Sequence, residues 1–155
     1  MKFPPSFVIH KHRASELHYD LRLEISGVLK SWVLPKGPTL DTAVKRLAFQ
    51  VDDQALSYMH FEGLIKQGCD AEELIIWDRG SYLPETDMEK GLKEGNLAFS
   101  LDGSKLMGGF ILIRLDKWSG KYPMWLLKKK LDKFVTDQDI TLSHPGSIVS
   151  LRRID

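Results

Sequence analysis

The chain has 155 residues, of which 43% are hydrophobic, 28% charged and 10% aromatic, and its formal net charge is +1 at pH 7. This composition is ordinary for a globular protein and excludes a disordered chain, and no apolar run approaches the roughly 20 residues that a membrane-spanning helix needs. The near-neutral charge does not indicate a strongly basic nucleic-acid-binding surface. Cys69 is the single cysteine, which excludes an internal disulfide framework and a multi-cysteine zinc module. The N-terminus carries no apolar signal-peptide segment, so we expect a cytoplasmic protein.

The dominant hydrophobic period along the chain is two residues, which predicts β-strands. The predicted strands, in chain order, are His18–Ile25, Val28–Leu34, Arg46–Asp52, Leu74–Asp78, Leu97–Leu101, Lys105–Leu115 and Trp125–Lys129. Ser26-Gly27, Arg79-Gly80 and Asp102-Gly103 predict turns between strands.

Other segments interrupt the strands. Pro35 and Pro38 end the second strand, and residues 39–44 predict a loop or a single helical turn. Glu85–Lys93 and the residues around Leu131–Val135 predict short helices. Many short strands with frequent turns, without an internal repeat or a linker, predict a single antiparallel barrel or sandwich.

The polar face of the strand His18–Ile25 carries an unusual series, namely His18, Asp20, Arg22 and Glu24. Residues i and i+2 on one strand face lie roughly 6.5–7 Å apart. His18 and Asp20 can therefore converge on one divalent cation with bonds near 2.0–2.2 Å. Imidazole and carboxylate ligands suit Zn, Mn or Fe. Arg22 follows on the same face, where its guanidinium can clamp an anion beside the metal.

Such a site needs a second histidine. His10 and His12 lie on one face of the preceding segment, Phe7–His12. If this segment runs beside the His18 strand, His12 completes a site of two histidines and one carboxylate. The alternative interpretation is a solvated polar face on which the histidines occur by chance.

Further cations follow downstream. The alternation of Arg46–Asp52 predicts that Leu47, Phe49 and Val51 face the apolar side. The polar face would then hold Arg46, Gln50, Asp52 and Gln54. Lys36, Arg22 and Arg46 around one metal imply an anionic ligand such as phosphate, because buried cations without an anion are costly. Exposed surface is the alternative for Lys36 and Arg46.

Motifs along nearly the whole chain match one family. They are Phe7–His12, Leu17–Glu24, Leu29–Pro38, Lys45–Ala48, Tyr58–Gly63, Trp77–Gly80, Lys105–Arg114, Trp125–Leu127 and Ser147–Ser150. On these motifs the chain resembles the 3′-phosphoesterase domain of the bacterial and archaeal DNA ligase D family. The spacings are intact through the first 63 residues.

The resemblance implies one 3′-phosphoesterase-like domain over residues 1–155. Its expected fold is mainly β, a small closed or partly open antiparallel β-barrel with one or two short helices and a crescent-like groove. It implies an enzyme of non-homologous end joining that removes a 3′-terminal ribonucleoside and then the remaining 3′-phosphate. The expected partners are DNA 3′ ends on a primer–template and a separate DNA ligase or polymerase, without a membrane.

The resemblance also assigns site residues. It implies that His12, His18 and Asp20 bind the metal, with Mn²⁺ preferred, although the same ligands accept Zn²⁺ or another divalent cation. Arg22, Lys36 and Arg46 would hold the phosphate, and Tyr58 would line the site.

Three departures from the family pattern bear on activity. The family usually has a histidine where this chain has Gln54, and an amide cannot donate a titratable proton. We therefore expect a reduced or altered phosphatase step. His10 stands where the family usually has glutamine, and Ile65–Glu73 replaces a glycine-rich stretch. His10 or His60 is a candidate replacement for the missing imidazole.

Two alternative functions remain open. One is a catalytically degenerate module that binds DNA ends or a repair partner without turnover. The other is a non-haem iron oxygenase, which would use His18 and Asp20 with His144 and Arg152. Only 17 residues precede His18, too few for the strands that normally come first in such oxygenases.

Overall fold

The computed structural model describes residues 3–67 and 70–154, so Cys69 lies outside the described residues. The strands are β1 Ser6–Arg13, β2 Leu17–Ile25, β3 Val28–Leu34, β4 Lys45–Gln54, β5 Gly63–Gln67, β6 Asp70–Pro84, β7 Asn96–Gly103, β8 Met107–Ser119 and β9 Tyr122–Lys129. The helices are the 3₁₀-helix η1 Leu56–His60 and the α-helices α1 Met88–Glu94 and α2 Ile140–Ser143. None of the helices in the described ranges is long and apolar enough to cross a membrane.

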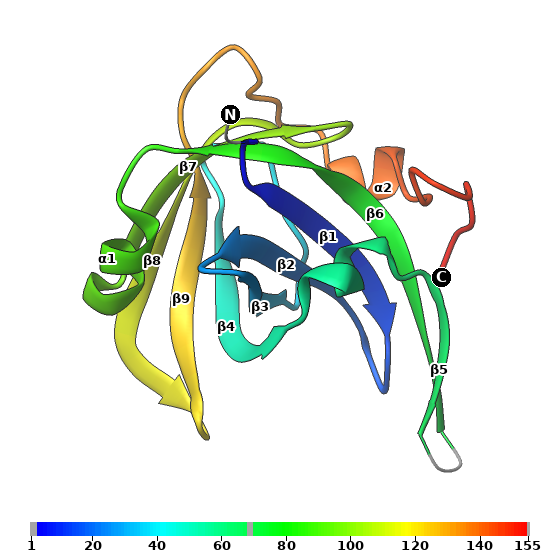
Figure 1. Ribbon diagram of the computed structural model, residues 1–155. Coiled ribbons are helices and arrows are strands. Elements are labelled where there is room, and N and C mark those ends of the chain that lie inside the picture. The colour runs from blue at the N-terminus through cyan, green and yellow to red at the C-terminus, as the bar shows by residue number, and fades with distance from the viewer. Residues whose placement is uncertain (1–2, 68–69, 155) are drawn as a thin grey trace.

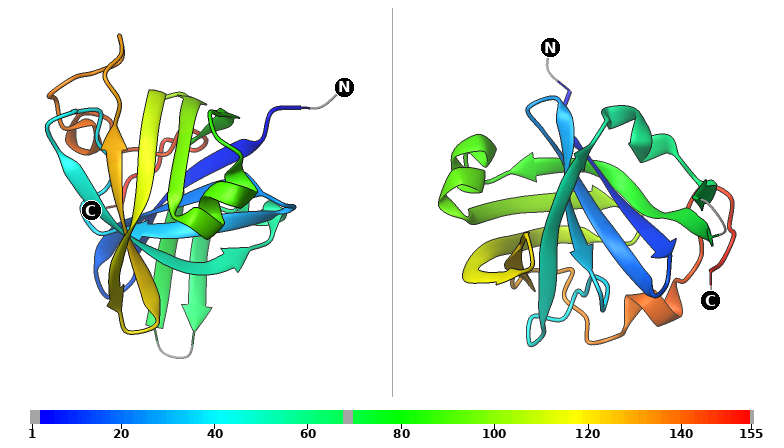
Figure 2. Two further views of the ribbon diagram at one scale, coloured as in Figure 1. Left: turned by 90° about the vertical axis from the view of Figure 1, so that its left-hand side faces the viewer. Right: turned by 90° about the horizontal axis from the view of Figure 1, so that it is seen from below.

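The strands form a closed antiparallel barrel. Their hydrogen-bonded order is β1-β2-β3-β4-β9-β8-β7-β6-β5, and an additional pairing of β1 with β6 closes a ring of eight strands. Strand β5 pairs with β6 outside this ring. Figures 1 and 2 show the β8–β9 and β5–β6 hairpins extending from the same end of the barrel. The predicted small β-barrel is confirmed.

The core fills the ring. Alternating residues of the ring strands, apart from the bulged segments, point inward. Three fully buried tryptophans, Trp32, Trp77 and Trp125, are the largest core side chains. The rings of Trp32 and Trp125 meet edge to face at 5.5 Å. On β2, Leu21 and Leu23 point inward, so His18, Asp20 and Arg22 lie on the outer face. The alternation predicted for this strand is confirmed.

A smaller apolar cluster lies on the outer face of the barrel. Val8, Leu29 and Ile76 form it, and Tyr58 and neighbouring residues of η1 pack against it. Helix η1 therefore covers part of the outer face of β1, β3 and β6, beside the polar side chains of β2.

Two local predictions hold well. Ser26 and Gly27 both adopt positive φ, 54° and 81°, which is the geometry of a two-residue turn that suits hairpins. Helix α1, at Met88–Glu94, overlaps the predicted helix Glu85–Lys93. It begins after Asp87, whose side chain accepts a hydrogen bond from the Lys90 N–H, and ends at Gly95 in the left-handed conformation.

Two predicted turns are wrong. Strand β6 runs straight through Arg79-Gly80, because β1 pairs with it on one side and β7 on the other. Strand β7 also continues through Asp102-Gly103, and the chain reverses at residues 104–106. The buried carboxylate of Asp78 accepts hydrogen bonds from the backbone N–H groups of all three of these residues and so fixes the turn there.

The helix predicted around Leu131–Val135 is absent. Instead, the Asp132 carboxylate accepts hydrogen bonds from the backbone N–H groups of Gly109 and Phe134, which hold this segment in turns against β8. The second α-helix lies further on, at Ile140–Ser143. Strand β5 and helix η1 had no counterpart in the sequence-based prediction.

The predicted faces of β4 are also wrong. The three residues of β3 from Leu29 to Ser31 lie opposite the four of β4 from Val51 to Gln54, so β4 contains a bulge. A bulge shifts the alternation by one residue. Val51 and Gln54 therefore share the outer face, whereas Ala48 points into the core. Gln50 accepts a hydrogen bond from the core residue Trp125, 3.1 Å between Oε1 and Nε1.

Candidate active site

Strands β1 and β2 bring three potential metal ligands together. In their antiparallel register His12 lies opposite His18, and His10 lies opposite Asp20. Ligand atoms of His12, His18 and Asp20 all lie within 4.8 Å of one another. His12 Nδ1 and His18 Nε2 are each 3.2 Å from an oxygen of the Asp20 carboxylate. The segment Phe7–His12 therefore does pair with the His18 strand, which was the condition for His12 to complete the cluster.

The electrostatics of this cluster favour a cation. Burial alone would raise the pKa of Asp20, but hydrogen bonds from His12 and His18 and the charge of Arg22 hold that pKa well below its usual range. Burial would lower the pKa of His12, but the Asp20 and Glu72 carboxylates raise it. Two carboxylates thus draw a proton to His12, and a divalent cation can replace that proton as the positive charge.

Glu72 is a partner of this cluster that sequence reasoning missed. Its Oε2 lies 2.8 Å from His12 Nε2. A carboxylate on a ligating histidine orients the ring and increases its basicity. Glu72 comes from the start of β6, and only the pairing of β6 with β1 brings it to His12. Nothing local in the sequence distinguishes it from Glu73.

Arg22 is buried beside Asp20 and is held by three hydrogen bonds. It donates from Nη2 to Asp20 Oδ2 at 3.2 Å, from Nη1 to Ser31 Oγ at 2.8 Å and from Nε to His10 Nδ1 at 3.2 Å. The Tyr58 ring lies 5.0 Å from the guanidinium carbon. Three of the five N–H groups are used by these residues, which leaves two for an anion. The orientation of the guanidinium is fixed before any ligand arrives.

His10 does not face the cluster as a free imidazole. Its side chain is fully buried, Nδ1 accepts from Arg22, and Nε2 lies 3.0 Å from the Phe61 carbonyl oxygen. Burial and the neighbouring charge of Arg22 lower the pKa of His10 to about 4. His10 is therefore a neutral support for Arg22. His60 lies elsewhere, with Nδ1 3.4 Å from Arg79 Nη1.

The cluster opens into a cavity of about 220 Å³. Its lining residues are His12, His18, Asp20, Arg22, Val33, Val51, Asp52, Gln54 and Tyr122. The bulge of β4 brings Gln54 into this lining. Within the described lining, the imidazoles are those of His12 and His18, so Gln54 contributes an amide where the family pattern has a histidine.

The other predicted phosphate ligands lie outside this lining. Lys36 is exposed, two residues beyond the end of β3. Arg46 lies on β4, and its Nε is buried without a hydrogen-bond partner in the part of the chain described. Tyr58 contacts the cluster through Arg22 and stacks on Phe61, with ring centroids 5.6 Å apart.

The ligand set expected for an oxygenase is not assembled. The described candidate metal cluster unites His18 and Asp20 with His12, not with His144. The Nδ1 of His144 hydrogen-bonds to Ser143, and Arg152 forms an ion pair with Glu73.

The chemistry of the donor set fits a divalent cation next to an anion. Two imidazoles and one ionised carboxylate suit Mn, Fe or Zn, and they leave coordination positions open. The two unused N–H groups of Arg22 point to a ligand with several acceptor oxygens, such as a phosphate group.

Comparison with known sequences agrees with this chemistry. Residues 10–114 match the DNA ligase D 3′-phosphoesterase domain. The chain is similar to the multifunctional non-homologous end joining protein LigD of Pseudomonas aeruginosa, at 47% identity over 96% of the chain. It is also similar to LigD of Mycobacterium tuberculosis, at 41% over 73% of the chain, and of Mycolicibacterium smegmatis, at 37% over 82%.

The matched region is a small part of each relative. The alignments cover 18% of the Pseudomonas protein, 15% of the Mycobacterium protein and 17% of the Mycolicibacterium protein. The similarity therefore concerns one portion of multifunctional proteins.

Proposed function

Because the chain belongs to the family of DNA ligase D 3′-phosphoesterase domains, we propose that it is a hydrolase that processes DNA 3′ ends during non-homologous end joining. Residues 1–155 would constitute one such domain. The observation that carries the proposal is the cluster of His12, His18 and Asp20 in one cavity with the preorganised Arg22. The substrates would be primer–template ends that carry a terminal ribonucleotide or a 3′-phosphate.

In this proposal His12, His18 and Asp20 hold a divalent cation, preferentially Mn²⁺. Such a cation, when bound, acts as a Lewis acid on a phosphoryl oxygen. Arg22 binds the phosphoryl group through its two unused N–H groups and stabilises the negative charge that develops. Tyr58 and His10 keep the guanidinium in place. The phosphate-binding roles of Lys36 and Arg46 remain predictions.

Gln54 bears on which reaction proceeds. Its amide can donate a hydrogen bond to a substrate oxygen but cannot supply a proton to a leaving group. Neither His10 nor His60 lines the cavity. We therefore expect the phosphomonoesterase step to be weaker than the removal of the terminal ribonucleoside.

The same observation supports a second candidate function. With the amide of Gln54 in place of the imidazole of the family pattern, the chain could bind DNA ends or a repair partner without turnover. Binding of that kind would depend on salt concentration but not on Mn²⁺, because it would arise from contacts with phosphates.

An end-labelled primer–template assay tests both candidates. One substrate ends in a single ribonucleotide and the other in a 3′-phosphate, and each is incubated with and without Mn²⁺. We expect conversion of the ribonucleotide end only with Mn²⁺, and slower conversion of the phosphate end. His18→Ala and Asp20→Ala should each lower the rate at least ~100-fold, because each removes a ligand of the cation.

Full activity of either variant would overturn the metal assignment. Retained DNA binding without conversion of either end by the wild-type protein would favour the binding module. Gln54→His is the matched gain-of-function variant, since an imidazole at this position should increase phosphate removal more than ribonucleoside removal.

A further inference from the structure

A second pocket, of about 280 Å³, adjoins the cavity of the candidate site. Its lining residues are Gln50, Val51, Asp52, Trp118, Lys121, Tyr122 and Pro123. Val51, Asp52 and Tyr122 line both cavities. The two cavities are therefore neighbours, one at the metal-ligand cluster and the other at the β8–β9 hairpin.

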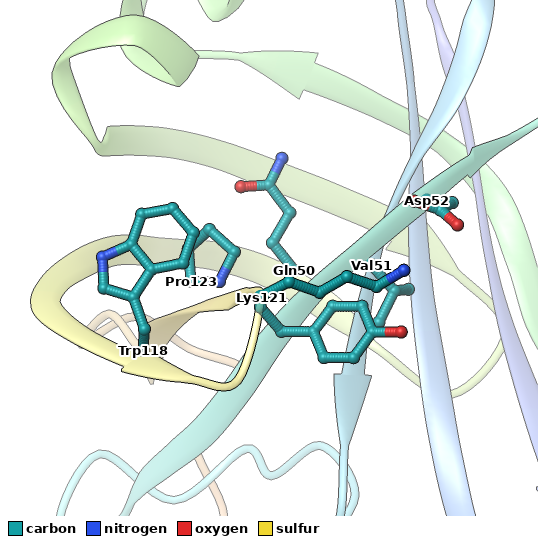
Figure 3. A pocket seen from close by; sticks show the side chains of 7 residues that line it. Gln50, Val51, Asp52, Trp118, Lys121 and Pro123 are labelled. Atoms are coloured by element: carbon teal, nitrogen blue, oxygen red, sulfur yellow. The ribbon is translucent and has the colours of Figure 1, made fainter.

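Trp118 is the most unusual residue of this second pocket. Its side chain is 62% exposed, whereas the other three tryptophans are fully buried in the core. The pairing of β8 with β9 is irregular between Arg114 and Trp118, where Trp118 lies opposite Pro123. Irregularities of this kind redirect side chains near functional sites. In Figure 3 the indole of Trp118 lies on the hairpin side of the pocket, across from strand β4.

Two further side chains of the pocket, Lys121 and Gln50, complement a nucleotide, whereas Asp52 is the acidic residue of the lining. Lys121 is exposed, its Nζ lies 5.4 Å from the Tyr122 ring, and no carboxylate of the described residues forms an ion pair with it. Gln50 uses its Oε1 for Trp125, and its amide NH₂ has no hydrogen-bond partner among the described residues. An aromatic face, a cation and a free amide donor match the base face, the phosphate and the base-edge acceptors of a nucleotide.

We propose that this pocket binds a nucleotide of the strand whose 3′ end enters the candidate site, with its base stacked on Trp118 and its phosphate near Lys121. The inference rests on the proposed function and extends it, because it names the part of the substrate that the hairpin recognises. Base–aromatic stacking tolerates every base, so this pocket would give affinity and position without sequence preference. The position of the pocket next to the metal-ligand cluster, with three lining residues in common, favours a DNA strand over a protein segment.

The test measures DNA binding and turnover with the whole chain. Trp118→Ala removes the stacking face, Trp118→Phe retains an aromatic ring, and Leu142→Ala removes an exposed apolar side chain far along the chain, on α2. Circular dichroism confirms folding of each variant. Fluorescence anisotropy with a 5′-labelled primer–template then gives Kd, and the end-labelled assay gives kcat and KM.

We expect Trp118→Ala to raise Kd and KM roughly tenfold with kcat little changed, since one stacked base contributes this much to affinity. The Kd and KM of Trp118→Phe should lie close to those of wild type, and those of Leu142→Ala should equal the wild-type values. A series of substrates with one abasic residue at successive positions from the 3′ end gives the sharper result. One abasic position should weaken binding by wild type but have no further effect on Trp118→Ala.

The outcomes separate this inference from the proposed function. If wild type converts DNA ends and Trp118→Ala has the same Kd, kcat and KM on every substrate, the nucleotide pocket is refuted. The proposed hydrolase function is then unaffected. If Trp118→Ala weakened DNA binding by the same factor for every position of the abasic residue, this would also refute stacking. Trp118 would then serve the hairpin fold or a protein partner. If wild type neither binds nor converts DNA, the proposed function fails and the inference fails with it.

Discussion

At the scale of single residues, His10 and Arg22 are a buried pair in which each side chain fixes the other. The imidazole accepts from Arg22 at one nitrogen, and the other nitrogen meets the Phe61 carbonyl. Because burial and the charge of Arg22 lower the pKa of His10 to about 4, the ring is neutral at physiological pH and offers one acceptor and one donor. A glutamine side chain offers the same pair of groups.

We therefore expect His10→Gln to retain activity within about threefold and His10→Ala to lose it. In the alanine variant the Arg22 Nε–H and the Phe61 carbonyl both lose their partner, which should cost about 1–3 kcal/mol of unfolding free energy for each unsatisfied buried group. Urea denaturation and the end-labelled assay, on the same preparations, measure both effects. Equal activity of the glutamine and alanine variants would show that His10 does not position Arg22.

At the same scale, sequence reasoning found the residues that lie in phase on one strand. His18, Asp20 and Arg22 follow from strict alternation, and His12 follows from a neighbouring strand of the same pattern. Glu72 could not be found in this way, because its contact with His12 depends on the long-range pairing of its strand, β6, with β1. The grouping of Lys36 and Arg46 with Arg22 rests on their charge, and charge does not indicate the direction in which a side chain points.

At the scale of elements, Asp132 ties the segment after β9 to the barrel. Its carboxylate lies 2.8 Å from Lys129 Nζ, and the Lys129 side chain is completely buried. Burial would raise the pKa of Asp132, but hydrogen bonds from Lys129, Gly109 and Phe134 lower it to about 2. The hydrogen bonds to this carboxylate hold the segment in turns, whereas the sequence predicts a helix here.

A lowered carboxyl pKa makes stability depend on pH. The ionised Asp132 stabilises the fold fully above its unfolded pKa near 4, and this contribution is lost as the pH falls towards 2. Asp132→Asn should therefore be less stable than wild type at pH 7, by about 1–3 kcal/mol, and the difference should shrink between pH 4 and pH 2. Thermal unfolding at several pH values checks this, and a constant difference across the range would contradict it.

Hydrophobic periodicity predicts strands but not every turn or strand face. It gave most strands of the barrel and the first hairpin, because alternating burial is a local property. It could not show the bulge in β4, which needs the register against β3, and so it assigned Gln50 and Gln54 to one face. It placed a turn at Asp102-Gly103, whereas the actual turn is fixed by Asp78, more than 20 residues earlier.

At the scale of the whole molecule, metal binding and folding should be linked. The three proposed ligands lie on the β1–β2 hairpin, which pairs with β3 on one side and with β6 on the other, so the fold holds the cluster in place. A ligand that binds only the folded state at 100 times its Kd adds about 2.7 kcal/mol of stability. For a chain of this size, that corresponds to roughly 5–10 °C in Tm.

We expect Mn²⁺ to raise Tm by this amount and EDTA to reverse the shift. His18→Ala and Asp20→Ala should show no shift, while Lys36→Ala should shift as wild type does, because Lys36 lies outside the ligand cluster. An equal shift in His18→Ala would place the metal elsewhere on the protein. This measurement does not depend on catalytic activity.

The closure of the ring has a consequence for the order in which the protein matures. The residues of the metal-ligand cluster span only nine positions, from His12 to Asp20, and are translated before β6 and β9. Their hairpin still lacks β6, and the ring itself closes only when β9, at Tyr122–Lys129, pairs with β4. Pairings this distant in sequence form slowly. The proposed ligands are therefore translated well before the strands that complete the barrel around their hairpin.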